Sequence, residues 1–215
     1  MVKHKSSRSR LIAPGEHRYA RLRAIPHSGC SRITCQVCSM TLACKEATEA
    51  RNMKVFVTGA TGYVGGSVST KLLEAGHEVI GLARSDDAAA ALKKRGIEPH
   101  AGDINAHTPI VEAAKRVDAV VNAANSDNVF VAHALLTALR GTGKVLIQTS
   151  GSSVVGKYDN GEASEDTFDE NTPFKPQPEK ATRVAIDEAV LAAAKAGVRS
   201  VVIRPTLIYG RGIGV

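Results

Sequence analysis

Residues 53–85 read MKVFVTGATGYVGGSVSTKLLEAGHEVIGLARS, and this stretch decides the fold. It begins with a short apolar run, 55–57, which is rich in residues that favour strands. Three glycines follow at once with the spacing G-x-x-G-x-x-G. Beyond them, Val64, Val68 and Leu72 recur every four residues, as apolar positions do on one face of a helix. The stretch therefore predicts a strand, a glycine turn and a helix, in that order.

The order of these elements gives each glycine a physical role. Gly59 permits a tight turn, Gly62 has no Cβ to obstruct a diphosphate, and Gly65 lets the helix lie close to the sheet. The N-terminus of the helix then presents free N–H groups and the positive end of its dipole to a phosphate. The alternative is an ordinary glycine-rich turn. We predict that the turn binds a dinucleotide cofactor through Gly59, Thr61, Gly62, Tyr63, Val64 and Gly65.

The residues after the next predicted strand, 78–82, favour one form of the cofactor. An acidic residue at this point would accept hydrogen bonds from the adenosine ribose and favour NAD. The position is neutral here, and Arg84 follows it. Because a guanidinium can bind the 2′-phosphate of NADP, we predict NADP rather than NAD. The alternative is that Arg84 is a solvated surface side chain.

The rest of the chain alternates strands with helices in the same way. Further strands are predicted up to Gly102-Asp103 and over 119–124, 144–149 and 200–203; helices are predicted over 86–94, from Thr108-Pro109, over 129–139 and over 179–196. Such alternation predicts an α/β fold, a doubly wound parallel sheet with helices on both faces, as in the Rossmann fold. Ligand sites in such sheets lie at the carboxyl ends of the strands. The unpatterned stretch 151–178 is expected to cover the strand end at Ser150, where a substrate would bind.

Composition divides the chain into two parts, which we expect to be a basic leader, 1–52, and a cofactor-binding domain, 53–215. The formal net charge is +7, but the leader holds ten Lys and Arg against three Asp and Glu, whereas the rest holds eighteen of each. Since the domain is neutral, a nucleic-acid partner is not expected. No apolar run approaches the roughly 20 residues that a membrane helix needs, so no membrane partner is expected either.

The leader holds all the cysteines of the chain, Cys30, Cys35, Cys38 and Cys44. A single C-x-x-C pair, without a second pair at matching spacing, does not predict a metal site. The Arg- and Ser-rich composition resembles an organellar transit peptide, whereas the strand-forming residues directly after Met53 favour Met53 as the true start. Because the domain has no cysteine, it suits a reducing cytosol, and we expect a cytoplasmic protein unless the leader directs import.

Together these features resemble the short-chain dehydrogenase/reductase superfamily, in its extended and atypical branches, which include the NAD-dependent epimerase/dehydratases. The motifs that carry the resemblance are TGATGYVG at 58–65, GHEVIGLAR at 76–84, GDI at 102–104, VVNAA at 120–124, TSG at 149–151 and VVIRPTLIYG at 201–210. The resemblance implies that Asp103 contacts the adenine, that Ile104 belongs to the cofactor site, and that Ala123 and Ala124 line the ribose side. It also implies an enzyme for a small carbonyl or sugar-type substrate.

The sequence departs from the family at the usual catalytic positions. The family carries YxxxK on the long helix, where the tyrosine exchanges a proton and the lysine lowers the pKa of the tyrosine. Aligned on Glu188, the chain has Lys180 in the tyrosine position and Val184 in the lysine position. By this alignment both catalytic residues of the family are missing.

Two functions are consistent with this departure. In the first, the chain is an NADP-dependent oxidoreductase or epimerase-like enzyme, in which Lys180 or Arg183 stabilises a developing oxyanion. The family serine falls at Gly151, so the flanking Ser150 or Ser152 would donate a hydrogen bond; the alternative for the two cations is a solvated helix face. In the second, the fold binds NADP without turnover, as a sensor or scaffold for a protein partner. Binding of NADPH without its consumption would favour the second function.

The end of the chain is a second departure. Extended members of the family continue into a smaller substrate-binding lobe, whereas this chain ends at Val215. We therefore expect that the substrate lobe is missing and that the chain is truncated. A native mass of ~30 kDa or more would indicate the missing lobe.

Overall fold

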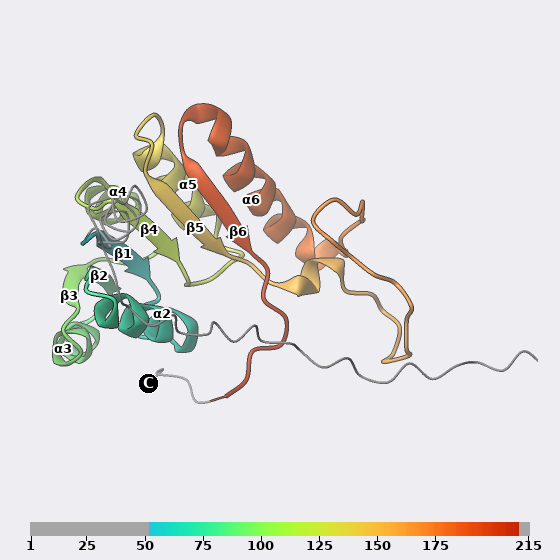
Figure 1. The fold of residues 1–215 in the computed structure, drawn as a ribbon, viewed down its shortest axis with the longest axis horizontal. Helices are drawn as coiled ribbons and strands as arrows, with labels where there is room; N and C mark the ends of the chain where they lie inside the picture. The colour runs from blue at the N-terminus through green and yellow to red at the C-terminus, as the bar shows by residue number, and fades with distance from the viewer. Residues whose placement is uncertain (1–51, 211–215) are drawn as a thin grey trace, which may run out of the picture. The chain divides into compact units, whose positions relative to one another are not determined.

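The computed structural model describes residues 52–210 (Figure 1). This part of the chain folds into a single sheet of six parallel strands with the order β3-β2-β1-β4-β5-β6. The strands are β1 (Lys54–Thr58), β2 (Glu78–Ala83), β3 (Glu98–Ala101), β4 (Ala119–Asn122), β5 (Val145–Thr149) and β6 (Arg199–Ile203). The predicted α/β fold, a doubly wound parallel sheet, is confirmed.

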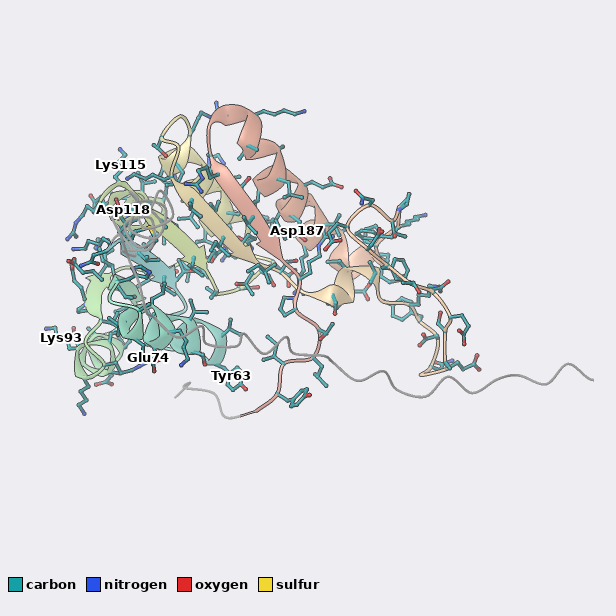
Figure 2. All side chains as sticks on the ribbon, in the orientation of Figure 1. Tyr63, Glu74, Lys93, Lys115, Asp118 and Asp187 are labelled. Atoms are coloured by element: carbon teal, nitrogen blue, oxygen red, sulfur yellow. The ribbon has the colours of Figure 1, made fainter. Side chains whose placement is uncertain are left out.

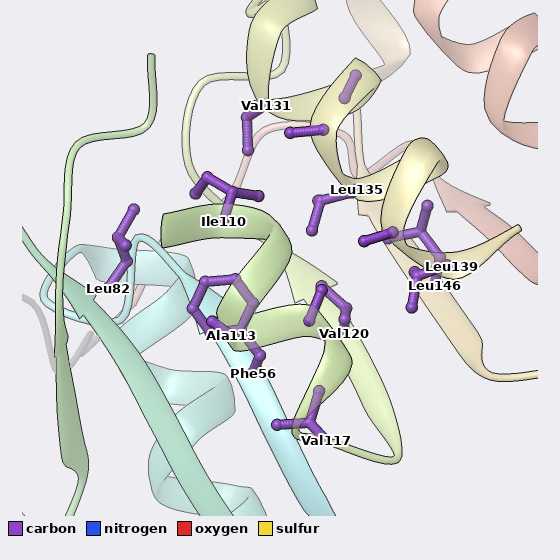
Figure 3. Packing of buried hydrophobic residues seen from close by; sticks show 14 of the residues in the cluster. Phe56, Leu82, Ile110, Ala113, Val117, Val120, Val131, Leu135, Leu139 and Leu146 are labelled. Atoms are coloured by element: carbon purple, nitrogen blue, oxygen red, sulfur yellow. The ribbon is translucent and has the colours of Figure 1, made fainter. Parts of the chain in front are cut away.

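Helices pack on both faces of this sheet. The α-helices are α2 (Tyr63–Glu74), α3 (Asp86–Lys94), α4 (His107–Lys115), α5 (Val129–Leu139) and α6 (Ala181–Ala192), and the 3₁₀-helices are η1 (Ser152–Val155), η2 (Pro178–Lys180) and η3 (Ala193–Ala196). Phe56 of β1 lies in a buried cluster with residues of α4, α5 and α6, and Figure 3 shows it beside Ala113 of α4. Its neighbours Val55 and Val57 pack with α2 and α3. Burial on both faces explains why β1, β2 and β4 read as apolar runs without alternation.

Helix boundaries agree closely with the predictions except at α4 and α6. The prediction placed Pro109 in the first helical position, but α4 begins at His107 and Pro109 is its third residue. Proline is tolerated there because the N–H groups of the first turn have no partner within the helix. The predicted helix 179–196 is α6 with η2 and η3 at its ends, where tighter turns are common. It stops at Gly197, whose φ of 75° is left-handed.

A row of buried polar side chains joins three strands near their carboxyl ends. The hydroxyl of Thr58 in β1 donates to Oδ1 of Asn122 in β4, and Nδ2 of Asn122 donates to Oε1 of Gln148 in β5 at 2.8 Å. All three side chains are buried. Because buried polar groups are costly without partners, this row fixes the relative positions of the strand ends. The ends of β1 and β4 are the point where the strand order reverses.

Residues 1–51 and 211–215 lie outside the described part. The predictions for the leader 1–52, including its cysteines and its role in import, and for the chain end at Val215 therefore stay predictions. Within residues 52–210, no group of three or more His, Cys, Asp or Glu side chains could hold a metal ion. The helices of this part are also too short or too polar to cross a membrane.

Candidate functional site

The glycine turn lies where the strand order reverses. Gly59 follows β1 with a φ of 70°, a conformation that a residue with a side chain rarely adopts. The turn closes by a hydrogen bond from the N–H of Gly62 to the carbonyl oxygen of Gly59, at 2.9 Å. A Cβ on Gly59 would lie 2.8 Å from the carbonyl oxygen of Ala123, which follows β4. The turn therefore packs directly against the segment after β4, and only glycine fits there.

The other two glycines differ in what surrounds them. A Cβ on Gly65 would lie 2.2 Å from the carbonyl oxygen of Gly59, so this glycine allows α2 to approach the turn. A Cβ on Gly62 would meet only that same oxygen, at 3.3 Å, and the φ of Gly62 is −85°. Close packing and a left-handed backbone thus explain Gly59 and Gly65. At Gly62 neither a left-handed backbone nor a severe clash requires glycine, although a Cβ there would contact that oxygen more closely than is usual.

The N-terminus of α2 carries no side-chain cap. At the N-termini of α3 and α5, Ser85 and Asn128 accept hydrogen bonds from the N–H groups of Ala88 and Val131, whereas α4 and α6, like α2, have no side-chain cap. The first N–H groups of a helix have no partner inside it and carry the positive end of the helix dipole. The N-terminus of α2 can therefore receive an anionic group from outside the helix.

A cavity of about 420 Å³ opens beside this turn. Its lining includes five of the residues predicted to bind the cofactor: Gly59, Thr61, Arg84, Ile104 and Ala124. It also includes six that the sequence reasoning missed: Leu82, Ser85, Asp87, Ala88, Ala91 and Gly102. Four of the six lie at the start of α3 or one turn further on, directly after Arg84. Their helical spacing was visible in the sequence, but which face of α3 lines the cavity depends on how that helix packs.

Arg84 contributes an exposed guanidinium to this cavity. Within residues 52–210, it makes no hydrogen bond or ion pair, so its charge is available to a ligand. Asp87, the second residue of α3, lines the same cavity and also has no such partner in that part of the chain. The cavity therefore carries one positive and one negative side chain near the start of α3.

The remaining predicted cofactor residues surround the turn or the cavity. Tyr63 stands at the N-terminal end of α2 and donates its hydroxyl to the carbonyl oxygen of Gly210, at 3.0 Å (Figure 2). Val64 is the second residue of α2 and is half-buried. Asp103 is exposed, and its Oδ1 accepts a hydrogen bond from the N–H of Asn105. Ala123, which meets Gly59, completes the set.

A second group of polar residues lies beyond β4 and β5. Arg183 of α6 donates from Nε and Nη2 to the two carboxylate oxygens of Asp127, at 2.9 and 2.5 Å, and from Nη1 to Oγ of Ser153, at 3.2 Å. The Arg183 guanidinium lowers the pKa of Asp127, and the carboxylate in turn raises the pKa of Arg183. Arg183 is therefore charged and held in place by its partners. It is not a freely solvated side chain, which was the alternative for this residue.

The predicted serines differ in their surroundings. Ser150 is buried, and its hydroxyl donates to Oδ2 of Asp187 at 2.9 Å, so its proton points into the protein. Asp187, labelled on α6 in Figure 2, is fully buried and also accepts from Nε of Arg204 at 2.9 Å. Ser152 opens η1 and lines a second cavity of about 450 Å³, which is otherwise mostly apolar. Of the two serines, Ser152 is the one with access to this space.

The alignment matched Lys180 and Val184 to the tyrosine and lysine of YxxxK, and the two residues lie in different surroundings. Lys180 directly precedes α6 without a side-chain hydrogen bond to the helix, and its charge adds to the lowering of the pKa of Asp127. Val184 is buried in the protein, with 9% of its surface exposed. Two other side chains of α6 reach the segments after β4 and β5: Arg183 contacts Asp127 after β4 and Ser153 after β5, and Asp187 accepts from Ser150 after β5.

Comparison with known proteins agrees with this geometry. The family model described as the NAD dependent epimerase/dehydratase family matches residues 55–214. An uncharacterised protein of Schizosaccharomyces pombe is 32% identical over 74% of the chain and 56% of its own length. The 2-alkyl-3-oxoalkanoate reductase of Stenotrophomonas maltophilia is 29% identical over 74% of the chain and 52% of its own length. The chain thus spans about half the length of the curated relatives that it matches.

Solved structures give the same fold at lower identity. The UDP-glucose 4-epimerase of Thermus thermophilus in complex with NAD is 22% identical, with a TM-score of 0.57 over 71% of the chain and 54% of that protein. The protein MoeE5 in complex with UDP-glucose and NAD is 23% identical, with a TM-score of 0.56 over 70% of the chain and 53% of that protein. At this identity the likeness shows the fold alone. None of the relatives named here supports the scaffold alternative.

Proposed function

The chain belongs to the NAD-dependent epimerase/dehydratase family, and we propose that it is an NADP-dependent reductase acting on a carbonyl group of a small molecule. The observation that carries the proposal is the uncapped N-terminus of α2 beside Gly62, which opens next to a cavity of about 420 Å³. A diphosphate would accept hydrogen bonds from the N–H groups there, and the adenosine end would occupy the cavity. The absence of a Cβ on Gly62 fits this use, because the one contact that a Cβ would make within the protein, with the carbonyl oxygen of Gly59 at 3.3 Å, is close but is not a severe clash.

Arg84 supports NADP over NAD. Its guanidinium lines the cavity and has no partner within residues 52–210, so it can bind a 2′-phosphate. A charge-assisted hydrogen bond contributes about 1.5–3 kcal/mol, or roughly 10- to 150-fold in affinity. Asp87 in the same cavity opposes an added phosphate, but both charges are solvated and repulsion at ~4 Å in water amounts to about 1 kcal/mol. The guanidinium therefore outweighs the carboxylate.

When bound, the reduced nicotinamide supplies the hydride. The chain itself would contribute positively charged side chains and a hydrogen-bond donor to the substrate carbonyl, near the ends of β4 and β5. Arg183, held by Asp127, places a fixed positive charge there, which can stabilise the negative charge that develops on a carbonyl oxygen. Ser152 can donate a hydrogen bond, and the half-buried Lys180 adds a second positive charge nearby. We place these three residues in the catalytic site, with Ser150 positioned behind them through Asp187.

The relatives support a ketone as the substrate class. Two curated relatives, at 29% and 27% identity, are named as reductases of 3-oxo compounds, whereas the epimerases are similar in fold alone. The second cavity suits such a substrate because Ser152 and five apolar side chains line it, and the charged residues of its wall are Asp169, Glu170 and Arg204. Residues 168–170, from the predicted covering stretch, form part of this wall.

The test measures binding first and turnover second. NADPH and NADH are titrated separately into the wild-type protein and Arg84→Ala, and NADPH oxidation is then followed with 3-oxoalkanoates, simple ketones and UDP-glucose. We expect the wild type to prefer NADPH and the variant to lose about tenfold or more of that preference. Failure of the wild type to bind either cofactor would overturn the proposal. Binding without oxidation by any carbonyl substrate would overturn the reductase assignment.

A further inference from the structure

Arg95, a residue outside the cavity, makes the contacts that hold the glycine turn from behind. It follows α3, and its side chain is half-buried. Its Nη1 donates to the carbonyl oxygen of Ala60 at 3.1 Å. Its Nη2 donates to the carbonyl oxygen of Gly66 at 2.6 Å and to Oγ1 of Thr70 at 3.2 Å. One guanidinium thus joins the turn to the first two turns of α2.

These contacts differ from those of an ordinary surface arginine. Arg116 occupies the equivalent place after α4, and there the guanidinium pairs with the carboxylate of Glu98 at 2.8 Å. No carboxylate of residues 52–210 pairs with Arg95. Its guanidinium donates hydrogen bonds to two backbone oxygens and one hydroxyl instead. A planar guanidinium with five N–H groups can reach three acceptors in different directions, which a lysine ammonium at the end of a flexible chain does less well.

The contact with Ala60 sets the direction of a neighbouring N–H group. Ala60 lies between Gly59 and Thr61, and its carbonyl shares a planar trans peptide with the N–H of Thr61. In such a peptide the C=O and N–H groups point in opposite directions, so holding the oxygen toward Arg95 turns the N–H away from it. That N–H makes no hydrogen bond within residues 52–210, and Thr61 lines the cavity.

We infer that Arg95 is a positioning residue for the cofactor: it keeps the carbonyl of Ala60 turned away from the diphosphate and the N–H of Thr61 turned toward it. The inference rests on the proposed function, since it assumes a diphosphate at the turn. The positive charge of Arg95 lies on the far side of the Ala60–Thr61 peptide from the N–H of Thr61. It adds to the positive field at the N-terminus of α2. Arg95 acts through Ala60 and Thr61, without touching the ligand.

The test compares NADPH affinity in the wild type, Arg95→Gln and Arg95→Lys, with Arg116→Gln as the matched control. Urea unfolding first establishes that each variant is folded under the titration conditions. We expect Arg95→Gln to weaken NADPH binding about tenfold, since charged hydrogen bonds that shape the turn are lost. Arg95→Lys should recover part of that loss, because it restores the charge and some donors, and Arg116→Gln should bind as the wild type does.

A milder variant keeps the test decisive if Arg95→Gln does not fold. Thr70→Val removes one acceptor of the guanidinium without removing the arginine, and we expect it to weaken NADPH binding about two- to threefold. Unchanged affinity in every folded variant of Arg95 and Thr70 would overturn the inference, as would an equal loss in Arg116→Gln. Failure of the wild type itself to bind NADPH would instead overturn the proposed function, so the two failures are distinguishable.

Discussion

Replacing Gly62 with alanine should change NADPH affinity strongly and the stability of the protein little. The backbone at Gly62 has a φ of −85° and a ψ of 175°, which alanine adopts without strain. The added Cβ would meet only the carbonyl oxygen of Gly59, at 3.3 Å, a contact that a small shift relieves. Alanine is a poorer N-cap than glycine but restricts the unfolded chain, and these effects are each about 0.5–1 kcal/mol with opposite sign. We therefore expect Gly62→Ala to change the free energy of unfolding by less than about 1 kcal/mol.

The same methyl group should interfere strongly with binding. If a diphosphate approaches the turn at Gly62, the Cβ displaces it and weakens at least one charge-assisted hydrogen bond, which predicts a roughly 10- to 150-fold loss of NADPH affinity. Fluorescence titration of NADPH and urea unfolding measure the two quantities on the same sample. Gly76→Ala is the opposite control, because Gly76 has a φ of 83° at the far end of α2 and its Cβ would meet nothing within 4 Å. It should lose about 1 kcal/mol of stability and bind NADPH normally.

A folded Gly62→Ala protein with the NADPH affinity of the wild type would refute the reasoning. It would mean that no ligand comes close to the Cα of Gly62, and the uncapped N-terminus of α2 would lose its proposed use. Equal weakening in Gly62→Ala and Gly76→Ala would also refute it, because a general effect on α2 would then explain both results.

Three further predictions concern neighbouring residues. Gly65→Ala should destabilise the protein by about 3 kcal/mol in urea unfolding, since its Cβ would lie 2.2 Å from a backbone oxygen of Gly59; a loss below about 1 kcal/mol would contradict the packing described. Asp87→Asn should raise NADPH affinity up to about fivefold at low salt and leave NADH affinity unchanged, and an equal gain for both cofactors would place Asp87 away from the 2′-phosphate. Arg183 lowers the pKa of Asp127 below its usual value of 3.8, so the stability that this pair adds is complete above that value and is lost as the pH falls through the lower folded pKa. Wild type and Asp127→Asn should therefore differ in unfolding free energy at about pH 6 and converge in strong acid; a constant difference would contradict the ion pair.

The fold could be predicted because its signals are local. The Ser85 cap and the helix 129–139 lie where the residue pattern placed them, since capping and apolar periodicity depend on residues a few positions apart. The start of α4 was predicted two residues too late, at Pro109 instead of His107, because the local signal there is ambiguous. Pro109 is accepted throughout a first turn, so its presence does not fix the residue at which a helix begins. Where local rules allow several answers, packing decides among them.

The cofactor site was predicted in part for a related reason. Gly59 and Gly65 belong to one short motif, and their mutual contact is local in sequence. Arg95 lies 35 and 29 residues from the turn and helix oxygens that it holds, and no pattern in the sequence links them. The pair of Asp127 with Arg183 spans 56 residues. Contacts of this kind depend on which strands are neighbours and on how each helix is rotated on the sheet.

Helix α6, which carries residues of the proposed catalytic site, shows how much a shift of one residue in the alignment matters. Aligning the chain on Glu188 placed Val184 in the lysine position, but Glu188 is exposed, whereas Asp187 is fully buried and pairs with Arg204. An anchor on Asp187 instead would match Arg183 to the family's lysine and Glu179 to its tyrosine, so the tyrosine would be missing in this alignment as well. A fixed cation then stands on the side of α6 that reaches the strand ends, as the chemistry proposed here requires.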